Sequence, residues 1–205
     1  MAPRDTYRHG DLPNALIAAG VELAREGGPD AVVLREATRR VGVAPNAAYR
    51  HFADRRALLA AVSQVGLAEL ARTMEREPAG AASCARARLR ALARGYLAFA
   101  QSEPGLFRAA FATTGMADTD TGEAAGTGGR TAYRLLSEAL DDLATTGALS
   151  PGHRPDAEYF VWSTVHGMAV LLTDGPLRGL RPPEAEEAER RVMEAVERGL
   201  CGTSG

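Results

Sequence analysis

With 205 residues, the chain is long enough for one large domain or two small ones, and its 24 arginines nearly balance 26 acidic residues. The two cysteines do not indicate a disulfide framework. The sequence has no run of about 18 apolar residues that could span a membrane and no apolar signal segment for secretion. We therefore expect a cytoplasmic protein with reduced thiols. Residues 1–60 hold nine arginines and seven acidic residues, and the remainder holds fifteen arginines and nineteen acidic residues. This charge asymmetry is expected of a nucleic-acid-binding N-terminal segment, and chance explains it about equally well.

The first predicted helix begins near residue 11 and ends at a glycine pair. Asp11 is a candidate N-cap, Pro13 suits the first turn, and Gly27-Gly28-Pro29 ends the helix. Leu12 and Leu16 begin an apolar face that continues at helical spacing. We expect this helix to pack against the next two helices and to close a three-helix head.

Residues 34–52, with the sequence LREATRRVGVAPNAAYRHF, are predicted to form two short helices joined by a tight turn. Apolar residues recur at helical spacing in the first eight residues, and Gly42 then suits a helix end that needs a positive φ. Ala48 and Phe52, four residues apart, give the second helix an apolar side. Two short helices around a glycine turn, with polar and cationic residues outside, are typical of a helix-turn-helix.

This segment resembles the DNA-binding domain of the TetR family of bacterial repressors. The resemblance rests on LREATRRVGV, on the run Tyr49-Arg50-His51-Phe52 and on Arg55 three residues later, where the family has lysine. Val33 and Ala44 stand where the family prefers serine or threonine, so both helices lack a usual side-chain N-cap, a loss of about 1 kcal/mol each. The resemblance implies a homodimeric transcriptional regulator, a repressor that binds a palindromic operator in double-stranded DNA and releases it when a small-molecule effector binds.

Eight residues of the head are candidates for DNA contact: Arg35, Pro45, Asn46, Ala47, Tyr49, Arg50, His51 and Arg55. Arg35 suits guanine and Asn46 suits adenine, because their side chains can form paired hydrogen bonds with base edges. Pro45 and Ala47 suit a thymine methyl group, and Tyr49 suits a base edge or, like the basic residues after it, a phosphate. The alternative for each of them is an ordinary solvent-exposed residue without a role in DNA binding. Tyr49 has a further alternative, which is packing within the head.

Six further helices are predicted after the head, which makes nine in an all-α fold. Asp54 and Asp156 are candidate N-caps, and the helix after Asp54 reaches from the head into the body, to about residue 77. The later helices cover about residues 83–101, 106–111, 132–143, 156–173 and 184–198. We place a helix-turn-helix DNA-binding domain at residues 9–56 and a helical ligand-binding and dimerisation domain at residues 57–205.

Six residues of the body are candidates for effector binding: Tyr96, Phe99, Phe107, Phe111, Trp162 and His166. Trp162 and His166 share one helix face, and with Gly167 they look like the Trp-His-Gly feature of one C-terminal domain type in the TetR family. His166 is either a polar group that faces an apolar ligand or a core histidine with a hydrogen-bonded partner. The aromatic residues either line a cavity or belong to the ordinary hydrophobic core. Residues 113–129 are predicted to form a mobile loop, either an ordinary surface loop or a ligand lid.

The helix of residues 157–174 is apolar on nearly all sides. We expect it to form a dimer interface together with residues 184–199, while a central core helix covered by its own chain is the alternative. No catalytic constellation, cofactor motif or metal-ligand set appears, so an enzyme is a distant third choice. The main rival to a regulator is a helical small-molecule-binding or scaffold protein without specific operator binding, an alternative that Val33 and Ala44 support.

Overall fold

The computed structural model of the protein describes residues 11–76, 84–113 and 120–201. These contain α1 (Leu12–Gly27), α2 (Leu34–Val41), α3 (Pro45–Ala48), α4 (Arg55–Arg76), α5 (Ala85–Ser102), α6 (Pro104–Ala110), α7 (Ala132–Thr145), α8 (Ala157–Thr173) and α9 (Pro182–Cys201). Short 3₁₀ turns are η1 (Pro29–Ala31), η3 (Gly122–Ala124) and η4 (Pro151–His153). The predicted all-α fold is confirmed, since no strand occurs in this part of the chain.

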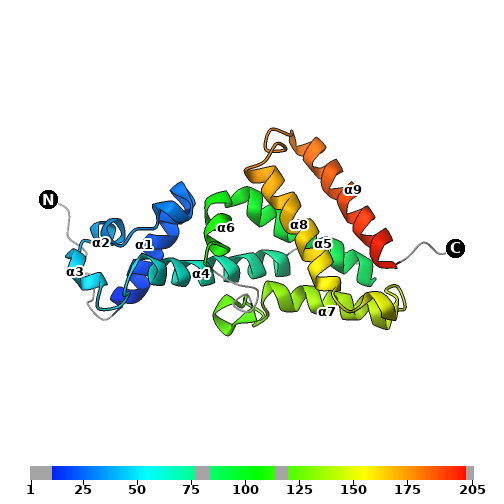
Figure 1. Cartoon of the computed structure of the whole chain (residues 1–205), viewed down its shortest axis with the longest axis horizontal. Coiled ribbons are helices and arrows are strands. Elements are labelled where there is room, and N and C mark those ends of the chain that lie inside the picture. Colours follow the sequence, from blue (N-terminus) through cyan, green and yellow to red (C-terminus); the bar gives the residue numbers. More distant parts are fainter. Residues whose placement is uncertain (1–10, 77–83, 114–119, 202–205) are drawn as a thin grey trace.

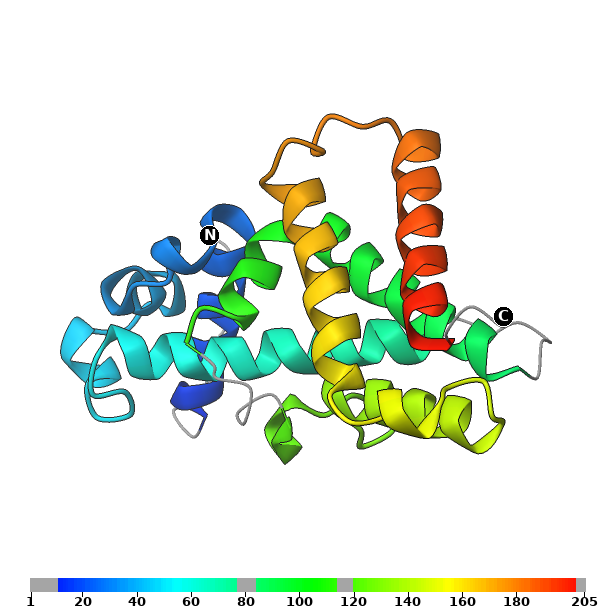
Figure 2. The same ribbon diagram turned by 45° about the vertical axis from the view of Figure 1, so that its right-hand side comes forward.

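The molecule is elongated, with a head of α1 to α3 at one end and a body of α5 to α9 at the other (Figure 1). Helix α4 runs from the head into the body and packs against α1, α5, α6 and α7. Helices α8 and α9 lie side by side on the outside of the body in both ribbon views (Figure 2). Because one apolar core extends from α1 through α4 to α9, the division at residue 56 stays a prediction.

Some helix ends follow the predicted capping residues and others do not. Asp54 caps α4, because its carboxylate accepts a hydrogen bond of 2.8 Å from the Ala57 N–H, and Gly42 ends α2 at a φ of 77°. The side chains of Asp11 and Asp156 make no capping hydrogen bond. Their backbones lie outside the extended region that a side-chain N-cap needs, with a left-handed φ of 64° at Asp156. Helix α7 is instead capped by Thr131, whose hydroxyl the sequence analysis did not single out.

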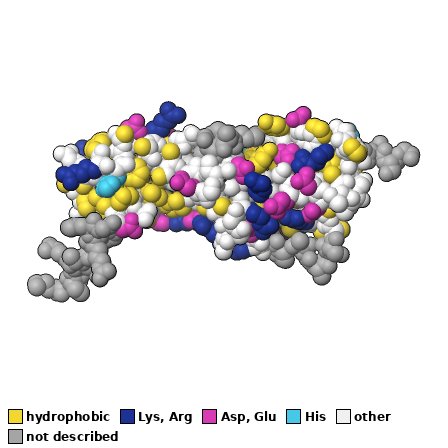
Figure 3. All heavy atoms as spheres, turned by 90° about the horizontal axis from the view of Figure 1, so that it is seen from below, with side chains coloured by type: hydrophobic (Ala, Val, Ile, Leu, Met, Phe, Trp, Pro, Cys, Tyr) yellow, Lys and Arg dark blue, Asp and Glu magenta, His cyan; other side chains and the backbone are white. Residues whose placement is uncertain are grey.

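The predicted loop of residues 113–129 lies partly outside the described residues, at positions 114–119. The segment that follows is anchored on α4 rather than free: Ala124 is buried against Leu67, and the Gly128 N–H donates to the Glu75 carboxylate over 3.1 Å. Arg130 adds ion pairs to Glu75 on α4 and to α7. Residues 120–129 of the predicted loop are therefore held against α4 by these contacts. Seen from below, arginine and acidic side chains alternate over the body (Figure 3).

The C-terminal end of α1 is fastened to the body by an ion-pair network and by close backbone packing. Arg25 on α1 pairs with Glu69 on α4 at 3.0 Å and with Glu103, just before α6, at 3.2 Å. The first turn of α6 lies directly on the last carbonyl groups of α1. A Cβ atom at Gly105 would lie 2.2 Å from the Ala24 carbonyl oxygen. The backbones of α1 and α6 are therefore packed so closely that no side chain fits between them at this point.

Gly105→Ala is expected to lower the free energy of unfolding by about 1–3 kcal/mol, because the new methyl group forces α6 away from α1. Urea unfolding followed by circular dichroism at one protein concentration measures this change. Gly179→Ala is the matched control, since a Cβ atom there meets no atom within 4 Å. Equal unfolding midpoints for the two variants would show that the α1–α6 contact is looser than described.

Candidate functional site

The outer surface of the helix-turn-helix carries the predicted polar side chains. Helix α3 has only four residues, Pro45–Ala48, and is followed by a turn. Ala48 and Phe52 are buried and fix this segment on the head. Asn46, Tyr49, Arg50 and His51 are exposed, and Tyr49 has 59 % of its surface accessible, so it does not pack within the head. The N-cap positions of α2 and α3 make no side-chain capping bond, as the sequence predicts.

Arg35 differs from the other arginines of α2 because it has no hydrogen bond or ion pair with a described residue. Arg39 pairs with Glu36 at 2.6 Å, and Arg40 pairs with Glu26 and Glu36. Hydrogen bonds from Arg39, and then from Arg40, lower the pKa of Glu36 to about 2. Arg35 lies beside a hollow of about 560 Å³ between α2 and α3, where its guanidinium is available to an outside acceptor.

Arg55 has a different environment from the one predicted for a phosphate contact. Its Nε donates to the Val32 carbonyl oxygen over 3.0 Å, and its Nη2 donates to the Pro29 carbonyl oxygen over 2.7 Å. The guanidinium also lies 3.4 Å from the Asp30 carboxylate. Arg55 therefore ties the start of α4 to the connection between α1 and α2, and its contact with a DNA phosphate stays a prediction.

Arg55→Ala is expected to lower the free energy of unfolding by about 1–2 kcal/mol, because two main-chain carbonyl groups lose a charged donor. Thermal unfolding at fixed protein concentration measures the effect. Arg56→Ala is the matched control: Arg56 is exposed and has no hydrogen bond or ion pair with a described residue. If both variants unfold at the same temperature, the Arg55 guanidinium does not stabilise the head, and its predicted contact with a DNA phosphate gains support.

A cluster of aromatic rings occupies the centre of the body. The Tyr96 hydroxyl on α5 lies 2.8 Å from Nδ1 of His166 on α8. Phe107 of α6 and Phe111, directly after α6, pack against His166 with ring centroids 5.4 and 4.8 Å away, and Trp162 packs against Tyr96 at 6.2 Å. Burial raises the pKa of Tyr96 and lowers that of His166, so both groups are neutral at pH 7. His166 therefore has the hydrogen-bonded partner that one sequence interpretation expected.

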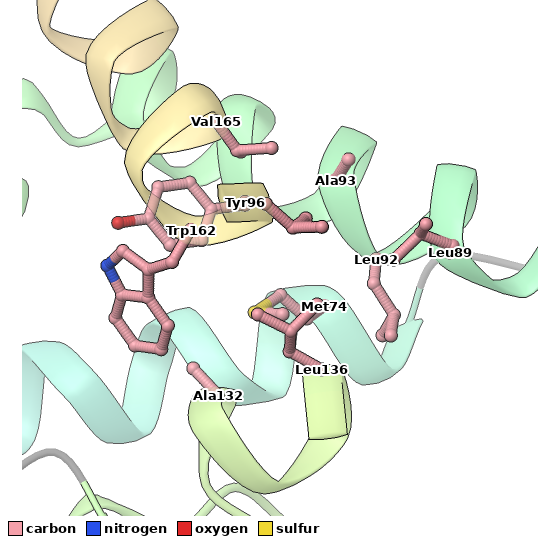
Figure 4. Close-up of a pocket in the computed structure, with 10 residues that line it drawn as sticks. Met74, Leu89, Leu92, Ala93, Tyr96, Ala132, Leu136, Trp162 and Val165 are labelled. Atoms are coloured by element: carbon pink, nitrogen blue, oxygen red, sulfur yellow. The ribbon is translucent and has the colours of Figure 1, made fainter. Parts of the chain in front are cut away.

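A cavity of about 30 Å³ lies next to this cluster, between α4, α5, α7 and α8. Its walls are Met74, Leu89, Leu92, Ala93, Tyr96, Ala132, Leu136, Val161, Trp162 and Val165 (Figure 4). The Tyr96 hydroxyl and the Trp162 indole nitrogen point away from Met74 and Leu92, so the walls are apolar. Its volume accommodates a few atoms only.

Of the six predicted effector-binding residues, Tyr96 and Trp162 line the cavity. Phe99, Phe107, Phe111 and His166 are not among its walls, although Phe107, Phe111 and His166 pack against the Tyr96 ring. The effector-binding role of these six residues stays a prediction. The aliphatic wall residues were not predicted as a site, since their spacing signals burial and does not distinguish a cavity wall from solid core.

Helix α8 presents an exposed apolar face to the outside of the body. This α8 face consists of the exposed residues Tyr159, Phe160, Ser163, Val170 and Leu171 and of half-buried Gly167. Phe160, Val170 and Leu171 expose 44 %, 40 % and 40 % of their surface, whereas large apolar residues elsewhere on α8, such as Val161 and Leu172, are buried. Next to it on α9 lie Ala195, which is exposed, and Gly199, where a Cβ atom would lie 3.1 Å from the Phe160 ring.

Within residues 11–76, 84–113 and 120–201, no group of three or more histidine, cysteine, aspartate or glutamate side chains is arranged to hold a metal ion. No described helix combines the length and the apolar character that crossing a bilayer requires.

Comparisons with known proteins match both parts of the chain. A model of bacterial regulatory proteins of the tetR family matches residues 16–62, and a model of the tetracyclin repressor-like C-terminal domain matches residues 89–196. A curated relative, the tetracycline repressor protein class A from transposon 1721 of Escherichia coli, is 42% identical over 57 residues. That match covers 28% of this chain and spans about a quarter, 26%, of the relative's length.

Solved structures are similar over nearly the whole chain. A protein with unknown function from Rhodococcus sp. RHA1 is 28% identical, with a TM-score of 0.74 over 97% of this chain and 100% of that one. TetR from Acinetobacter baumannii AYE is 22% identical and has a TM-score of 0.64, over 91% and 94% of the two chains. The second likeness concerns the fold alone, but the C-terminal model covers more than half of the sequence. The chain therefore belongs to the TetR family of bacterial regulatory proteins.

Proposed function

We propose that this TetR-family regulator is a homodimeric repressor that binds a palindromic DNA operator and releases it when a small, mostly apolar effector binds. The outer surface of the helix-turn-helix supports DNA binding. Buried Ala48 and Phe52 hold a short segment whose outer side is polar and cationic. Arg35 lies beside it with a guanidinium that no described carboxylate neutralises. Such a surface suits the major groove, where arginine and asparagine side chains distinguish base pairs.

The four residues of α3 contact few bases, so one head alone gives little sequence specificity. A two-fold dimer doubles the contact and spaces the two heads at successive turns of the DNA. The α8 face supports this assembly, because it combines exposed apolar side chains with the small residues Ser163 and Gly167. Small residues let two helices approach closely, and the apolar side chains then lose water on association.

The effector part rests on the cavity beside Tyr96 and Trp162. Because its volume is only about 30 Å³, a ligand of ten or more atoms has to move the surrounding helices apart. Met74 lines the cavity and belongs to α4, the helix that also packs against α1 in the head. A ligand that favours the displaced arrangement of α4 then favours a spacing of the heads that does not fit the operator. A coupling of about 1–3 kcal/mol weakens operator binding roughly 5- to 150-fold.

The test begins with DNA. Duplexes are enriched from a random pool by rounds of capture on the full chain, and binding of the enriched and shuffled sequences is compared by fluorescence anisotropy at several salt concentrations. We expect an inverted repeat, a preference of at least about 1,000-fold over shuffled duplex, and an affinity that falls with salt. If no DNA sequence is enriched while apolar compounds still quench Trp162 fluorescence, the result favours the alternative of a small-molecule-binding or scaffold protein.

Effector binding is tested separately with Trp162, the only tryptophan of the chain. Apolar compounds that change its fluorescence are added to the preformed operator complex. Release of DNA is the expected result. Compounds that change the fluorescence but leave the operator affinity unchanged would leave a binding pocket without a regulatory role.

A further inference from the structure

The hollow of about 560 Å³ between α2 and α3, next to Arg35, has an apolar part. Three of its wall residues are apolar: Val33 before α2, Val43 in the turn and Pro45 at the start of α3. The turn after α2 brings Val43 back against that helix, where its N–H donates to the Thr38 carbonyl oxygen over 3.0 Å. Both helices lie at the end of the molecule that points away from the body (Figure 1). The helix-turn-helix therefore presents apolar surface at the far end of the head.

Val33 contributes the N-cap position of α2 to this hollow. Its backbone is extended, and its carbonyl oxygen accepts hydrogen bonds from the N–H groups of Glu36 and Ala37 over 3.1 and 3.0 Å. A hydroxyl or carboxylate side chain at this position would accept a further bond from the helix, which valine cannot do. The Val33 side chain instead leaves 41 % of the residue's surface in water. An apolar partner that covers its methyl groups would remove this surface from water.

Other polar side chains in the wall have partners within the head. The hydroxyl of buried Thr38 donates to the Arg35 carbonyl oxygen over 2.9 Å. The Glu36 carboxylate accepts hydrogen bonds of 2.8 and 2.6 Å from Arg39, so its negative charge largely cancels the attraction that Arg39 alone would exert on a phosphate. The N-cap positions of α2 and α3 also offer no hydroxyl group to a phosphate oxygen. This part of the hollow therefore suits an uncharged, apolar group better than a phosphate.

In the major groove, the apolar group on the base edges is the C5 methyl group of thymine, while guanine presents two acceptors to an arginine. We propose that each operator half-site has a thymine next to the guanine that Arg35 contacts, and that its methyl group packs against Val33 in the hollow, beside Val43 and Pro45. Val33 is then a specificity-determining residue. Neighbouring bases are about 3.4 Å apart, a spacing that a hollow of about 560 Å³ spans. This inference rests on the proposed function, in which this surface faces the major groove.

The experiment replaces single bases in the operator enriched from the random pool and measures binding of the full chain by fluorescence anisotropy. Replacement of a guanine by 7-deazaguanine removes the N7 acceptor, and it locates the guanine that Arg35 contacts, because the Arg35→Ala protein no longer distinguishes the two bases. Replacement of a thymine by uracil removes the methyl group alone. At the thymine next to that guanine, we expect uracil to lower the affinity about fourfold in one half-site and about 15-fold in both.

Two protein variants show whether Val33 is the residue that contacts this methyl group. In Val33→Ala the loss caused by uracil in one half-site should fall from about fourfold to less than about twofold, because less apolar surface faces the thymine. Val41→Ala is the matched control: it makes the same change in the same helix, at a residue that is not among the described ones lining the hollow, and the fourfold loss should persist. Circular dichroism of both variants confirms that the fold is retained.

Three results would overturn the assignment of Val33: no guanine whose replacement is felt through Arg35, no thymine next to that guanine, or a loss with uracil that is equally large in Val33→Ala. Each of them leaves the repressor proposal intact as long as an inverted repeat is enriched and bound. If no duplex is enriched at all, the repressor proposal fails together with this assignment. The two failures are therefore distinguished by the enrichment step, which precedes the base replacements.

Discussion

Leu171→Arg should convert the protein from a dimer to a monomer and reduce its operator affinity by more than about 100-fold. The reason is the position of Leu171 on the α8 face, where 40 % of its surface is exposed in a single chain. In a two-fold assembly through this face, two arginines would be buried without partners, at a cost of several kcal/mol for each charge. Light scattering and operator binding are measured on the same samples.

The matched control for this change is Thr145→Arg, which adds the same side chain at an exposed position near the end of α7. It should remain dimeric and bind the operator with unchanged affinity. A dimeric Leu171→Arg protein at micromolar concentration would place the interface elsewhere. A monomer that keeps the full operator affinity would contradict the need for two heads.

Arg35→Ala should weaken binding to the enriched operator by about 1–3 kcal/mol for each half-site, which is at least roughly 30-fold for the two-fold complex. The guanidinium of Arg35 has no described partner to give up, so its full hydrogen-bonding capacity is available to a base edge. Loss of a base contact lowers specificity, so binding to shuffled duplex should change much less than binding to the operator. Anisotropy titrations with both duplexes at several salt concentrations measure this difference.

Arg86→Ala is the control for charge, because Arg86 is an exposed arginine on α5 in the body without a described partner. It removes one positive charge and should leave both duplex affinities nearly unchanged. If Arg35→Ala weakens the operator and the shuffled duplex by the same factor and lowers the salt dependence by about one ion, Arg35 contacts phosphate and not a base. If neither affinity changes, Arg35 lies outside the interface.

Much of the fold follows from local sequence signals. The turn at Gly42 depends on one residue that adopts a positive φ at low cost, and the capping of α4 depends on Asp54 and the next three residues. Apolar residues at helical spacing predicted the existence of the helices, and their ends differ by a few residues from the expected ones. The outward position of Asn46, Arg50 and His51 follows from burial of Ala48 and Phe52 on the opposite side.

Other features depend on contacts between residues far apart in the chain. The intramolecular bonds of Arg55 are one example, because the carbonyl groups of Pro29 and Val32 lie within its reach only after the head has folded. The same limit applies to the anchored segment of residues 120–131, which is held through α4 and α7.

The sequence by itself determined the all-helical class, the helix-turn-helix and the group of aromatic residues in the body, because periodicity, capping and turn residues act over a few positions. Only the tertiary structure decided which of those aromatic rings line the cavity and which surround His166. Tyr96 and His166 are 70 residues apart, and their hydrogen bond exists because the packing of α5 against α8 brings the two polar groups together away from water. A buried polar atom takes the partner that the fold places nearest to it, and no local pattern of residues records that choice.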